Sequence, residues 1–548
     1  MITADIILII LGLLFSIALY IIAGFAVKII TPNWKIVYAV PFLISIIIAA
    51  IYGFEVSMLG VYIGTAVFLA GFVKDDLRIR RIACIVGAVC TVISIPVCML
   101  NNDYRTVSYV DDFNAGFKKM KKYYILAEHK GIDWDEVYNN SLPLFEKADE
   151  THDEVDNYIA WLYFTKQFRD GHVGYVPHKN YDDIHERALR RIAGNDYGLS
   201  MMTCADGRIA AVNVEENSIL TDAGIHNGTI ITLWNGKSPD EAADDSELFK
   251  VMPYSDKDNE AFFRVLHAAG TGGDTVDISY LDDNGQEQNI TLSKLGDYYD
   301  RYKETYDTVN QGLEAGHMSW TEINEKTACL RIKMMQYDSN ASYDQMKISI
   351  VSALKEYRER DFTNIVIDLR NNGGGSGEMV QVISEVFSPK GAHFYFTDGL
   401  WDGDNNCFAT DPETGKYLPG HENYFVGDDL WSDNQVVILV NNDSASAADH
   451  LPYVLMGHEK VTVMGFTESN GSAQGVSSVA LEVGSLGFSS SLVLDSNGDI
   501  AIDAGTDYES GNDIEIRVPF DEEAISALFD RNEDHLMNKA VEYFDSVK

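Results

Sequence analysis

Two hydroxyl side chains follow an apolar run, where the segment NNDSASAADH comes directly after VVILV. They belong to Ser444 and Ser446, and small residues surround both. A serine at the end of a strand can project its hydroxyl, while the backbone N–H groups that follow it point at the group it attacks. Serine and aspartate are equally common at helix N-caps, so this motif alone leaves both interpretations open.

A second motif, DLRNNGGG at 368–375, ends another apolar run with three consecutive glycines. Glycine accepts positive φ and lets backbone amides approach a ligand closely. An ordinary glycine turn is the alternative interpretation. A phosphate-binding P-loop fails because no GK[ST] pair follows, and a GxGxxG pattern finds no match here. The motif therefore favours an oxyanion hole, a pocket of amides that stabilises developing negative charge.

In this order, IVIDLRNNGGG, VVILVNNDSASAADH and VTVMGFTESNG resemble the catalytic core of the C-terminal-processing (tail-specific) and tricorn-like serine peptidases. Upstream, SILTDAGIHNGTIITLWNGK is similar to the PDZ domain that these enzymes carry, and FRDGHVGY resembles their D-G-H segment. The resemblance covers most of the chain from Asp111 to Leu536. It implies a peptidase that acts on polypeptides, in some cases near their C-terminal tails, with no cofactor and no metal.

The resemblance also implies a role for individual residues. It assigns Ser446 as the nucleophile because this serine opens a SAxE-like stretch, and it leaves Ser444 as a turn or capping hydroxyl. The oxyanion hole would combine the N–H of Ala447 with an amide of Gly373 or Gly374.

The resemblance further points to a histidine as the general base. Many members of the family use a lysine, but no lysine occurs between Lys460 and Lys539. The tricorn-like branch uses the D-G-H histidine, here His172, whose neutral imidazole can take the serine proton. His450 is the rival base, but on a helix that begins at Ser446 it would point along the helix.

The acid that orients the base has two candidates. The family has a glutamate before a glycine and a P-D-I-x-V stretch, which favours Glu509 in YESGNDIEIRVP slightly, although the proline is missing. Asp503 in AIDAG is the second candidate. Either carboxylate could instead be a solvated turn residue.

The PDZ resemblance implies how substrate is held. An extended chain would add a strand to a sheet edge, and its terminal carboxylate would meet backbone amides at Tyr197, Gly198, Leu199 and Ser200. A β-domain that only gates the active site is the alternative, and the sequence does not separate the two.

The apolar patterns indicate the elements that must position these residues. Apolar spacing is helical from 111 to 168, and short runs between turn residues indicate strands from about 197 to 295. Beyond that, strands alternate with helices, a pattern that places sites at the carboxyl ends of the strands. We therefore predict a multi-domain α+β protein with a helical cap over 101–190, a PDZ-like domain over 195–296, a linker over 297–316 and an α/β (crotonase-like ββα) peptidase core over 317–548.

Four apolar runs lie in the first hundred residues, and each is long enough to cross about 30 Å of hydrocarbon as a helix. Basic residues gather in the first and third connections, which places both termini outside by the positive-inside rule. These runs predict four transmembrane helices over 1–100 and a multi-pass protein of the cell membrane, with its catalytic domain extracytoplasmic. They cover 6–27, 36–54, 56–73 and 82–100.

Charge and cysteine content exclude other classes of function. The formal net charge of −41 argues against nucleic-acid binding, and the basic run KKMKK at 118–122 is typical of a solvated helix face. Cys204, Cys329 and Cys407 are too widely spaced for a disulfide framework, and no CxxC motif suggests zinc. A catalytically inactive PDZ-like peptide sensor or scaffold remains the alternative function. The sequence does not indicate an oligomeric state.

Overall fold

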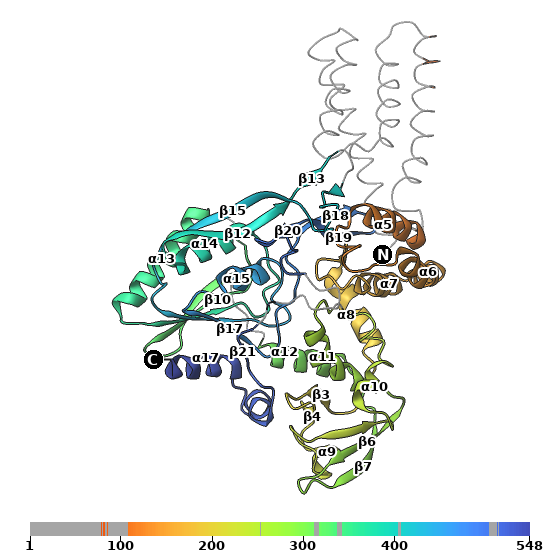
Figure 1. Ribbon diagram of the computed structural model, residues 1–548. Helices are drawn as coiled ribbons and strands as arrows, with labels where there is room; N and C mark the ends of the chain where they lie inside the picture. Colours follow the sequence, from red (N-terminus) through yellow and green to blue (C-terminus); the bar gives the residue numbers. More distant parts are fainter. Residues whose placement is uncertain are drawn as a thin grey trace. The chain divides into compact units, whose positions relative to one another are not determined.

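The computed structural model describes residues 78, 81, 82 and 85, and residues 108–547 except 253, 312–316, 337–341, 404–406, 504–511 and 513. The chain divides into two compact units, Met1–Val107 and Ser108–Lys548. The elements below all belong to the second unit (Figure 1).

One prediction of the sequence patterns needs correction. Within the described ranges, no helix is both long enough and apolar enough to cross a bilayer. For example, α6 (Trp134–Thr151) has 18 residues but carries acidic side chains in its first turn and near its end. The predicted four-helix transmembrane region and the multi-pass membrane location are therefore not supported. The apolar runs on which they rested lie outside the described residues, apart from Ile82 and Ile85.

The helical cap consists of α5 (Tyr109–Tyr123), α6 and α7 (Glu154–Lys166), with α8 (Tyr181–Ile192) farther along the chain. The first three helices each begin at a Ser or Asp N-cap whose side chain accepts a backbone N–H, which satisfies an otherwise unpaired donor. Aromatic rings fill the space between them, and those of Phe113 and Phe145 stack at 4.3 Å. The cap therefore has an aromatic core of its own.

The D-G-H segment continues into β1 (Gly174–Pro177), which pairs with a strand that is not part of the cap. Its partner is β19 (Gly484–Ser491), and β19 also pairs with β18 (Gly475–Ala480), so the three form one antiparallel sheet. Leu486 and Phe488 of β19 complete the aromatic core of the cap. The pairing fixes the D-G-H segment against a part of the chain that is remote in sequence.

The segment 195–296 is β-rich, as predicted. Its strands form two-stranded and three-stranded antiparallel sheets around a core that includes Trp234 and Tyr197. That this segment is a PDZ domain stays a prediction. Its elements are β2 (Asn195–Asp196), β3 (Ser200–Thr203), β4 (Ile209–Val212), α9 (Ile219–Asp222), β5 (Ile231–Trp234), α10 (Pro239–Ala243), α11 (Lys257–Ala268), β6 (Thr275–Leu281), β7 (Glu287–Ser293) and β8 (Gly296–Asp297).

Most of the predicted linker, 297–316, is the helix α12 (Tyr299–Asn310). Tyr302, Thr305 and Val309 are three and four positions apart, so they share one face of the helix, and that face is buried. The helix therefore packs as part of the core. Its many polar residues hid this spacing in the sequence.

The peptidase core is built on a six-stranded sheet in the order β21-β17-β16-β11-β10-β9, parallel except for β9. Successive residues face opposite sides: Ile365 and Ile367 pack in one apolar cluster, and Val366 packs in the other. A strand buried on both faces needs a continuous apolar run, which is why the sequence revealed β10, β11 and β16, whereas the partly exposed β9 and the two-residue β21 were not predicted. The strands of this sheet are β9 (Met318–Glu322), β10 (Thr327–Ile332), β11 (Asn364–Asp368), β16 (Gln435–Leu439), β17 (Val461–Gly465) and β21 (Ile516–Arg517).

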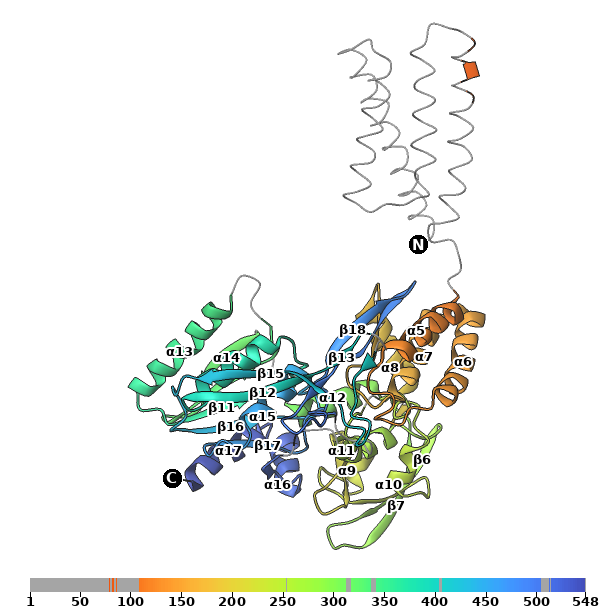
Figure 2. The same ribbon diagram turned by 45° about the horizontal axis from the view of Figure 1, so that its top comes forward.

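Helices cover both faces of this sheet (Figures 1 and 2). One face packs against α13 (Tyr343–Glu359), α14 (Gly377–Phe387) and α15 (Ala447–Leu455), and the other packs against α17 (His535–Ser546). The strands β12 (Gly391–Gly399), β15 (Pro419–Gly427) and β20 (Val493–Leu494) form a further sheet beside α14. The remaining elements are the hairpin β13 (Trp401–Asp402) and β14 (Cys407–Phe408), the helix α16 (Glu522–Ile525) and the π-helix η1 (Ser526–Asp530).

Candidate active site

Ser446 lies at the turn between β16 and α15, with φ 57° and ψ −120°. A non-glycine residue with positive φ is uncommon, and such strain gathers at functional sites. A serine in a strained strand-to-helix turn of this kind exposes its hydroxyl at the top of a sheet. The Ser446 side chain is half-buried, and its backbone N–H donates to the carbonyl of Ser472 at 2.7 Å.

Gly374 is packed directly against this serine. A Cβ at Gly374 would lie 2.5 Å from the Cβ of Ser446 and 2.6 Å from the carbonyl oxygen of Ala445, and its φ is +96°. Both the contact and the backbone conformation therefore require glycine at this position. The two motifs recognised in the sequence meet here.

The alternative serine, Ser444, has a different environment. Its side chain is fully buried, and its hydroxyl donates to the carbonyl of Leu369 at 2.9 Å and accepts the N–H of Asn441 at 3.0 Å. The bond to Leu369 holds the loop after β16 against the loop after β11, and the bond from Asn441 closes the turn within the first of these loops. This serine is engaged in the scaffold, which accords with its interpretation as a turn hydroxyl.

Two backbone amides beside Ser446 have no partner among the described residues. Ala447 is the first residue of α15, where helix N–H groups lack an intrahelical acceptor. Gly373 is exposed, and its N–H makes no backbone hydrogen bond in the described chain. The N–H of Gly374, by contrast, donates to Asn372 Oδ1 at 2.9 Å. Of the two glycines considered for the oxyanion hole, Gly373 therefore has the available donor.

The D-G-H segment, which contains His172, is linked through Ser472 to the loop that ends in Ser446, the candidate nucleophile. The Ser472 hydroxyl accepts the N–H of Gly171 at 2.7 Å, and the Ser472 carbonyl accepts the N–H of Ser446 at 2.7 Å. A Cβ at Gly171 would collide with Asn470, which again requires glycine. The D-G-H segment and the nucleophile turn are therefore anchored to the same residue.

The imidazole of His172 has no hydrogen bond to any residue that the structure describes. Both ring nitrogens are buried and have no partner among the described residues, so no bond joins them to Ser446 or to Asp503. Burial lowers the pKa of His172 below its usual 6.5, and the carboxylate of Asp170 opposes the shift. The ring is therefore neutral at pH 7, the state a general base requires. The Asp170 carboxylate also accepts the backbone N–H of His172 at 2.8 Å, which shapes the turn.

Of the two acid candidates, the structure describes Asp503, and Glu509 lies outside the described residues. Asp503 is fully buried with φ +56°, and its Oδ2 accepts the N–H of Ala473 at 2.9 Å. Its Oδ1 is buried and has no partner within the described ranges. Burial and the neighbouring Asp170 carboxylate raise the pKa of Asp503 to about 7.

Asp449 has a structural role that sequence reasoning missed. In the sequence, Asp449 served only to match the SAxE-like stretch that assigns Ser446 as the nucleophile. Its buried Oδ2 accepts the N–H groups of Gly471 and Ser472 at 2.8 and 2.9 Å, and Asn512 contacts Oδ1 at 3.2 Å. Burial raises the pKa of Asp449 to about 8, with a further contribution from the Asp503 carboxylate. The side chain thus shapes the loop that carries Ser472.

His450, the rival base, lies in an apolar pocket. Its ring stacks on Tyr395 with centroids 4.8 Å apart, and burial lowers its pKa to about 4. Its Nε2 is buried without a partner in the described chain. The packing against Tyr395 turns this ring toward the interior of the core.

The four residues predicted to receive a substrate carboxylate, Tyr197 to Ser200, are all buried. The Ser200 hydroxyl accepts hydrogen bonds from Tyr298 and Thr305, and a Cβ at Gly198 would meet Leu220 of α9 at 2.9 Å. The segment is therefore covered by α9 and by α12 with its N-cap residue Tyr298. In the described ranges, no group of three or more His, Cys, Asp or Glu side chains is arranged to hold a metal ion.

Comparison with known proteins identifies the class of the core. Residues 326–506, which include both loops around Ser446, match the family model described as Peptidase family S41. The chain therefore carries a Peptidase family S41 domain, and it is a serine-type peptidase. No curated protein matches the chain in sequence.

Solved structures of peptidases share the overall fold only weakly. Mature CPAF complexed with lactacystin is 12% identical with a TM-score of 0.48, covering 80% of this chain and 97% of CPAF. The photosystem II D1 C-terminal processing protease is 14% identical with a TM-score of 0.31, covering 78% of this chain and 99% of that one. The tricorn protease is 14% identical with a TM-score of 0.32, and the match covers 80% of this chain and 36% of the tricorn chain. At these scores, none of the three bears on the chemistry of this chain.

Proposed function

We propose that this chain is an endopeptidase that cleaves polypeptides through an acyl-enzyme on Ser446. The observation that carries the proposal is the positive φ of Ser446 at a strand-to-helix turn, with Gly374 pressed against it. A positive φ is a strained conformation for serine, and the surrounding structure must hold the residue in it. Such strain is typical of a nucleophile and unusual for a capping residue.

In the first half of the reaction, neutral His172 takes the proton of Ser446 as Oγ bonds to the carbonyl carbon of the substrate. The N–H groups of Gly373 and Ala447 donate to the oxygen that becomes negative. The carbon–nitrogen bond then breaks, and His172 gives its proton to the leaving amine. An ester to Ser446 remains.

In the second half, His172 takes a proton from water, and the hydroxyl oxygen attacks the ester carbonyl. The carbon–Oγ bond breaks, Ser446 regains its proton from His172, and the carboxylate product leaves. This cycle needs His172 within about 3 Å of Ser446 Oγ, and such contacts often tighten only when substrate is bound.

Asp503 is our candidate for the acid that stabilises the protonated imidazole. Its buried Oδ1 has no partner in the described chain, and the nearby carboxylate of Asp170, which raises the pKa of Asp503, also accepts the backbone N–H of His172. A carboxylate with a pKa of about 7 is ionised in roughly half of the molecules at neutral pH. Glu509 remains the other candidate from the family resemblance.

The segment 195–296 would act as a PDZ-like domain with one of two roles, either to receive the tails of unfolded polypeptides or only to gate the active site. The burial of Tyr197 to Ser200 beneath Leu220 favours a gating role, because an arriving strand must first displace α9. Cleavage near C-terminal tails follows if the domain holds the terminus.

An inactive peptide-binding module is the second candidate, and the unpartnered ring of His172 favours it. A fluorophosphonate probe, which reacts with activated serines, separates the two functions. We expect the full chain to be labelled, Ser446→Ala and His172→Ala to abolish labelling, and Ser444→Ala to retain it. Labelling that survives Ser446→Ala would refute the nucleophile, and an unlabelled parent that does not cleave casein would favour the inactive module.

A further inference from the structure

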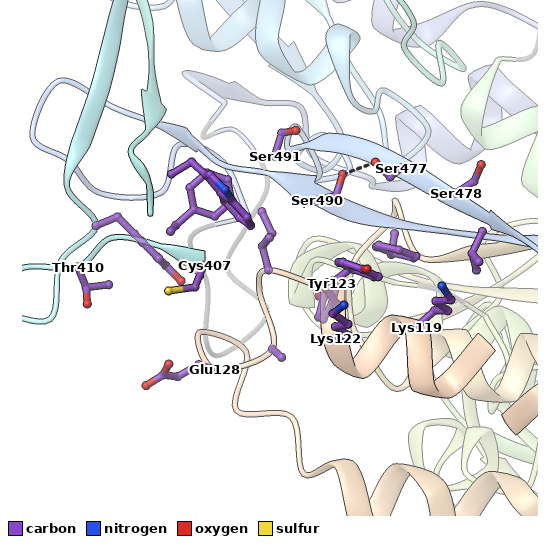
Figure 3. Close-up of a pocket in the computed structure, with 18 residues that line it drawn as sticks. Lys119, Lys122, Tyr123, Glu128, Cys407, Thr410, Ser477, Ser478, Ser490 and Ser491 are labelled. Carbon is purple, nitrogen blue, oxygen red and sulfur yellow. Dashed lines mark hydrogen bonds between the residues drawn. The ribbon is translucent and has the colours of Figure 1, made fainter. Parts of the chain in front are cut away.

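A cavity of about 780 Å³ lies apart from Ser446 and His172, on the side of the β18–β19 sheet that faces the cap. Figure 3 shows its lining, with α5 and the loop after it on one side, β18 and β19 on the other, and the β13–β14 hairpin at one end. The roles proposed for Ser446 and His172 do not involve this cavity. Its size suits several side chains rather than one.

Aromatic and apolar side chains form much of its wall. Trp401 of the hairpin is 50% exposed, and its ring meets that of Phe408 edge-on at 5.2 Å. Phe488 and Val479 of the sheet line the cavity opposite α5. A half-exposed tryptophan beside such a wall is costly in water, and aromatic anchors of this kind are common in binding sites.

Two lysines of α5 lie on the cavity with no acidic partner. Neither Lys119 nor Lys122 forms an ion pair in the described part of the chain, and both ammonium groups lie over the ring of Tyr123, at 5.9 and 4.7 Å from its centroid. Lys121 on the same helix pairs with Asp135 at 4.0 Å. The lining holds these two lysines and one carboxylate, that of Glu128, so it carries a net positive charge in a chain with a net charge of −41, which favours an anionic ligand.

The third side of the cavity offers backbone groups. Within the described chain, β18 pairs only with β19, so it is an edge strand. An edge strand has unpaired N–H and C=O groups that can pair with an extended chain. Ser477 and Ser478 of this strand line the cavity, and the hydroxyl of Ser490 donates to that of Ser477 at 2.8 Å.

We propose that this cavity binds an extended acidic segment of a polypeptide, in which an aromatic or large aliphatic side chain precedes carboxylates. The apolar side chain packs on Trp401 and Phe408, the carboxylates meet Lys119 and Lys122, and the backbone pairs with β18. The inference rests on the proposed function in taking a polypeptide as the ligand. Because β18 begins three residues after Ser472, a bound segment lies close to the nucleophile loop along the chain.

Fluorescence anisotropy of a labelled peptide tests the proposal in the full chain carrying Ser446→Ala, which cannot cleave it. The probe is Gly-Ser-Trp-Glu-Glu-Val-Ser-Gly, and the comparison peptide has lysines in place of the glutamates. We expect binding of the first peptide alone. The double variant Lys119→Glu and Lys122→Glu should weaken it by about tenfold or more, and Trp401→Ala by about tenfold.

The double variant Lys118→Glu and Lys121→Glu is the matched control, because it makes the same charge change on α5 outside the cavity lining, and it should change the affinity by less than about twofold. Equal binding of the two peptides, or variants that bind as the parent does, would overturn the proposal. Fluorophosphonate labelling of the parent reports on the peptidase independently. A labelled parent without peptide binding refutes only the cavity, and peptide binding to an unlabelled parent refutes only the peptidase.

Discussion

The hydroxyl of Tyr306 donates a hydrogen bond to the carboxylate of Asp443 at 2.8 Å, and this bond joins α12 to the loop that ends in Ser446. Asn442 in the same loop donates to the Tyr306 hydroxyl at 3.0 Å. At the end of α12, the carbonyl of Asn310 accepts the side-chain amide of Asn371, in the loop after β11. One helix therefore contacts both loops that form the candidate active site.

Removing the Tyr306 hydroxyl should loosen the nucleophile loop. We expect Tyr306→Phe to lower the free energy of unfolding by about 1–3 kcal/mol, because Asp443 and Asn442 lose a partner. Fluorophosphonate labelling should slow by about tenfold. Urea unfolding and labelling rates measure the two effects. Tyr424→Phe, which removes an exposed hydroxyl bonded to Glu422, is the control and should change neither.

The adjacent glycines Gly373 and Gly374 should respond differently to alanine. Gly374→Ala forces a Cβ against Ser446 at a positive φ, so we expect about 1–3 kcal/mol lower stability and the loss of labelling. A Cβ at Gly373 meets nothing within 4 Å, and alanine keeps the N–H, so Gly373→Ala should retain stability. Thermal unfolding of the two variants measures the difference in their stability. Equal stability of the two variants would contradict the packing described here.

Ser472→Ala should separate the D-G-H segment from the nucleophile turn. The substitution removes the acceptor of the Gly171 N–H and keeps the carbonyl that binds Ser446. We expect labelling to slow by about ten- to a hundredfold with a stability loss of about 1–3 kcal/mol. Ser546→Ala removes an exposed hydroxyl bonded to Tyr543 and should leave the labelling rate unchanged. Full labelling of the Ser472 variant would show that this bridge does not position the base.

Stability should fall as the pH rises through the range in which Asp449 ionises. The folded-state pKa of about 8 lies above the ordinary value of 3.8, so the folded chain keeps a proton that the unfolded chain loses. This contribution is complete below about pH 4 and is lost as the pH approaches about 8. The free energy of unfolding, measured with urea at several pH values in this range, should fall less steeply with pH for Asp449→Asn than for the parent. The same dependence on pH in both proteins would contradict a raised pKa.

The labelling rate should depend on pH through Asp503. If its ionised form supports His172, labelling should rise as the pH passes about 7, the pKa of Asp503. The pKa of His172 is lowered, so protonation of the ring should limit labelling only below its usual 6.5. Asp503→Asn should remove the rise near pH 7. A variant with the parent profile would move the role to Glu509.

The sequence predicted those parts of the site whose signals are local. The apolar runs of β11 and β16 end at the glycine loop and at Ser446, and the structure brings these ends together through Gly374. The β-rich character of 195–296 also followed from short runs between turns. Each of these signals needs only neighbouring residues.

Other features depend on contacts between distant segments, which no local pattern encodes. The bridge of Ser472 to Gly171 joins residues 301 positions apart, and β1 pairs with a strand near the other end of the chain. The contacts of the buried Asp449 with Gly471 and Ser472 likewise join segments more than twenty residues apart, and the SAxE-like stretch alone did not predict them. The helix α12 was hidden by its many polar residues, although Tyr302, Thr305 and Val309 carry a helical spacing that could have revealed it.

The pairing of β1 with β19 also has a consequence for biosynthesis. Gly174 and Tyr175, just after His172, pair with Gly487 and Leu486, which leave the ribosome after most of the chain has been made. A nascent chain that ends before β19 therefore lacks the strand that fixes this segment, so the candidate site is assembled late in synthesis.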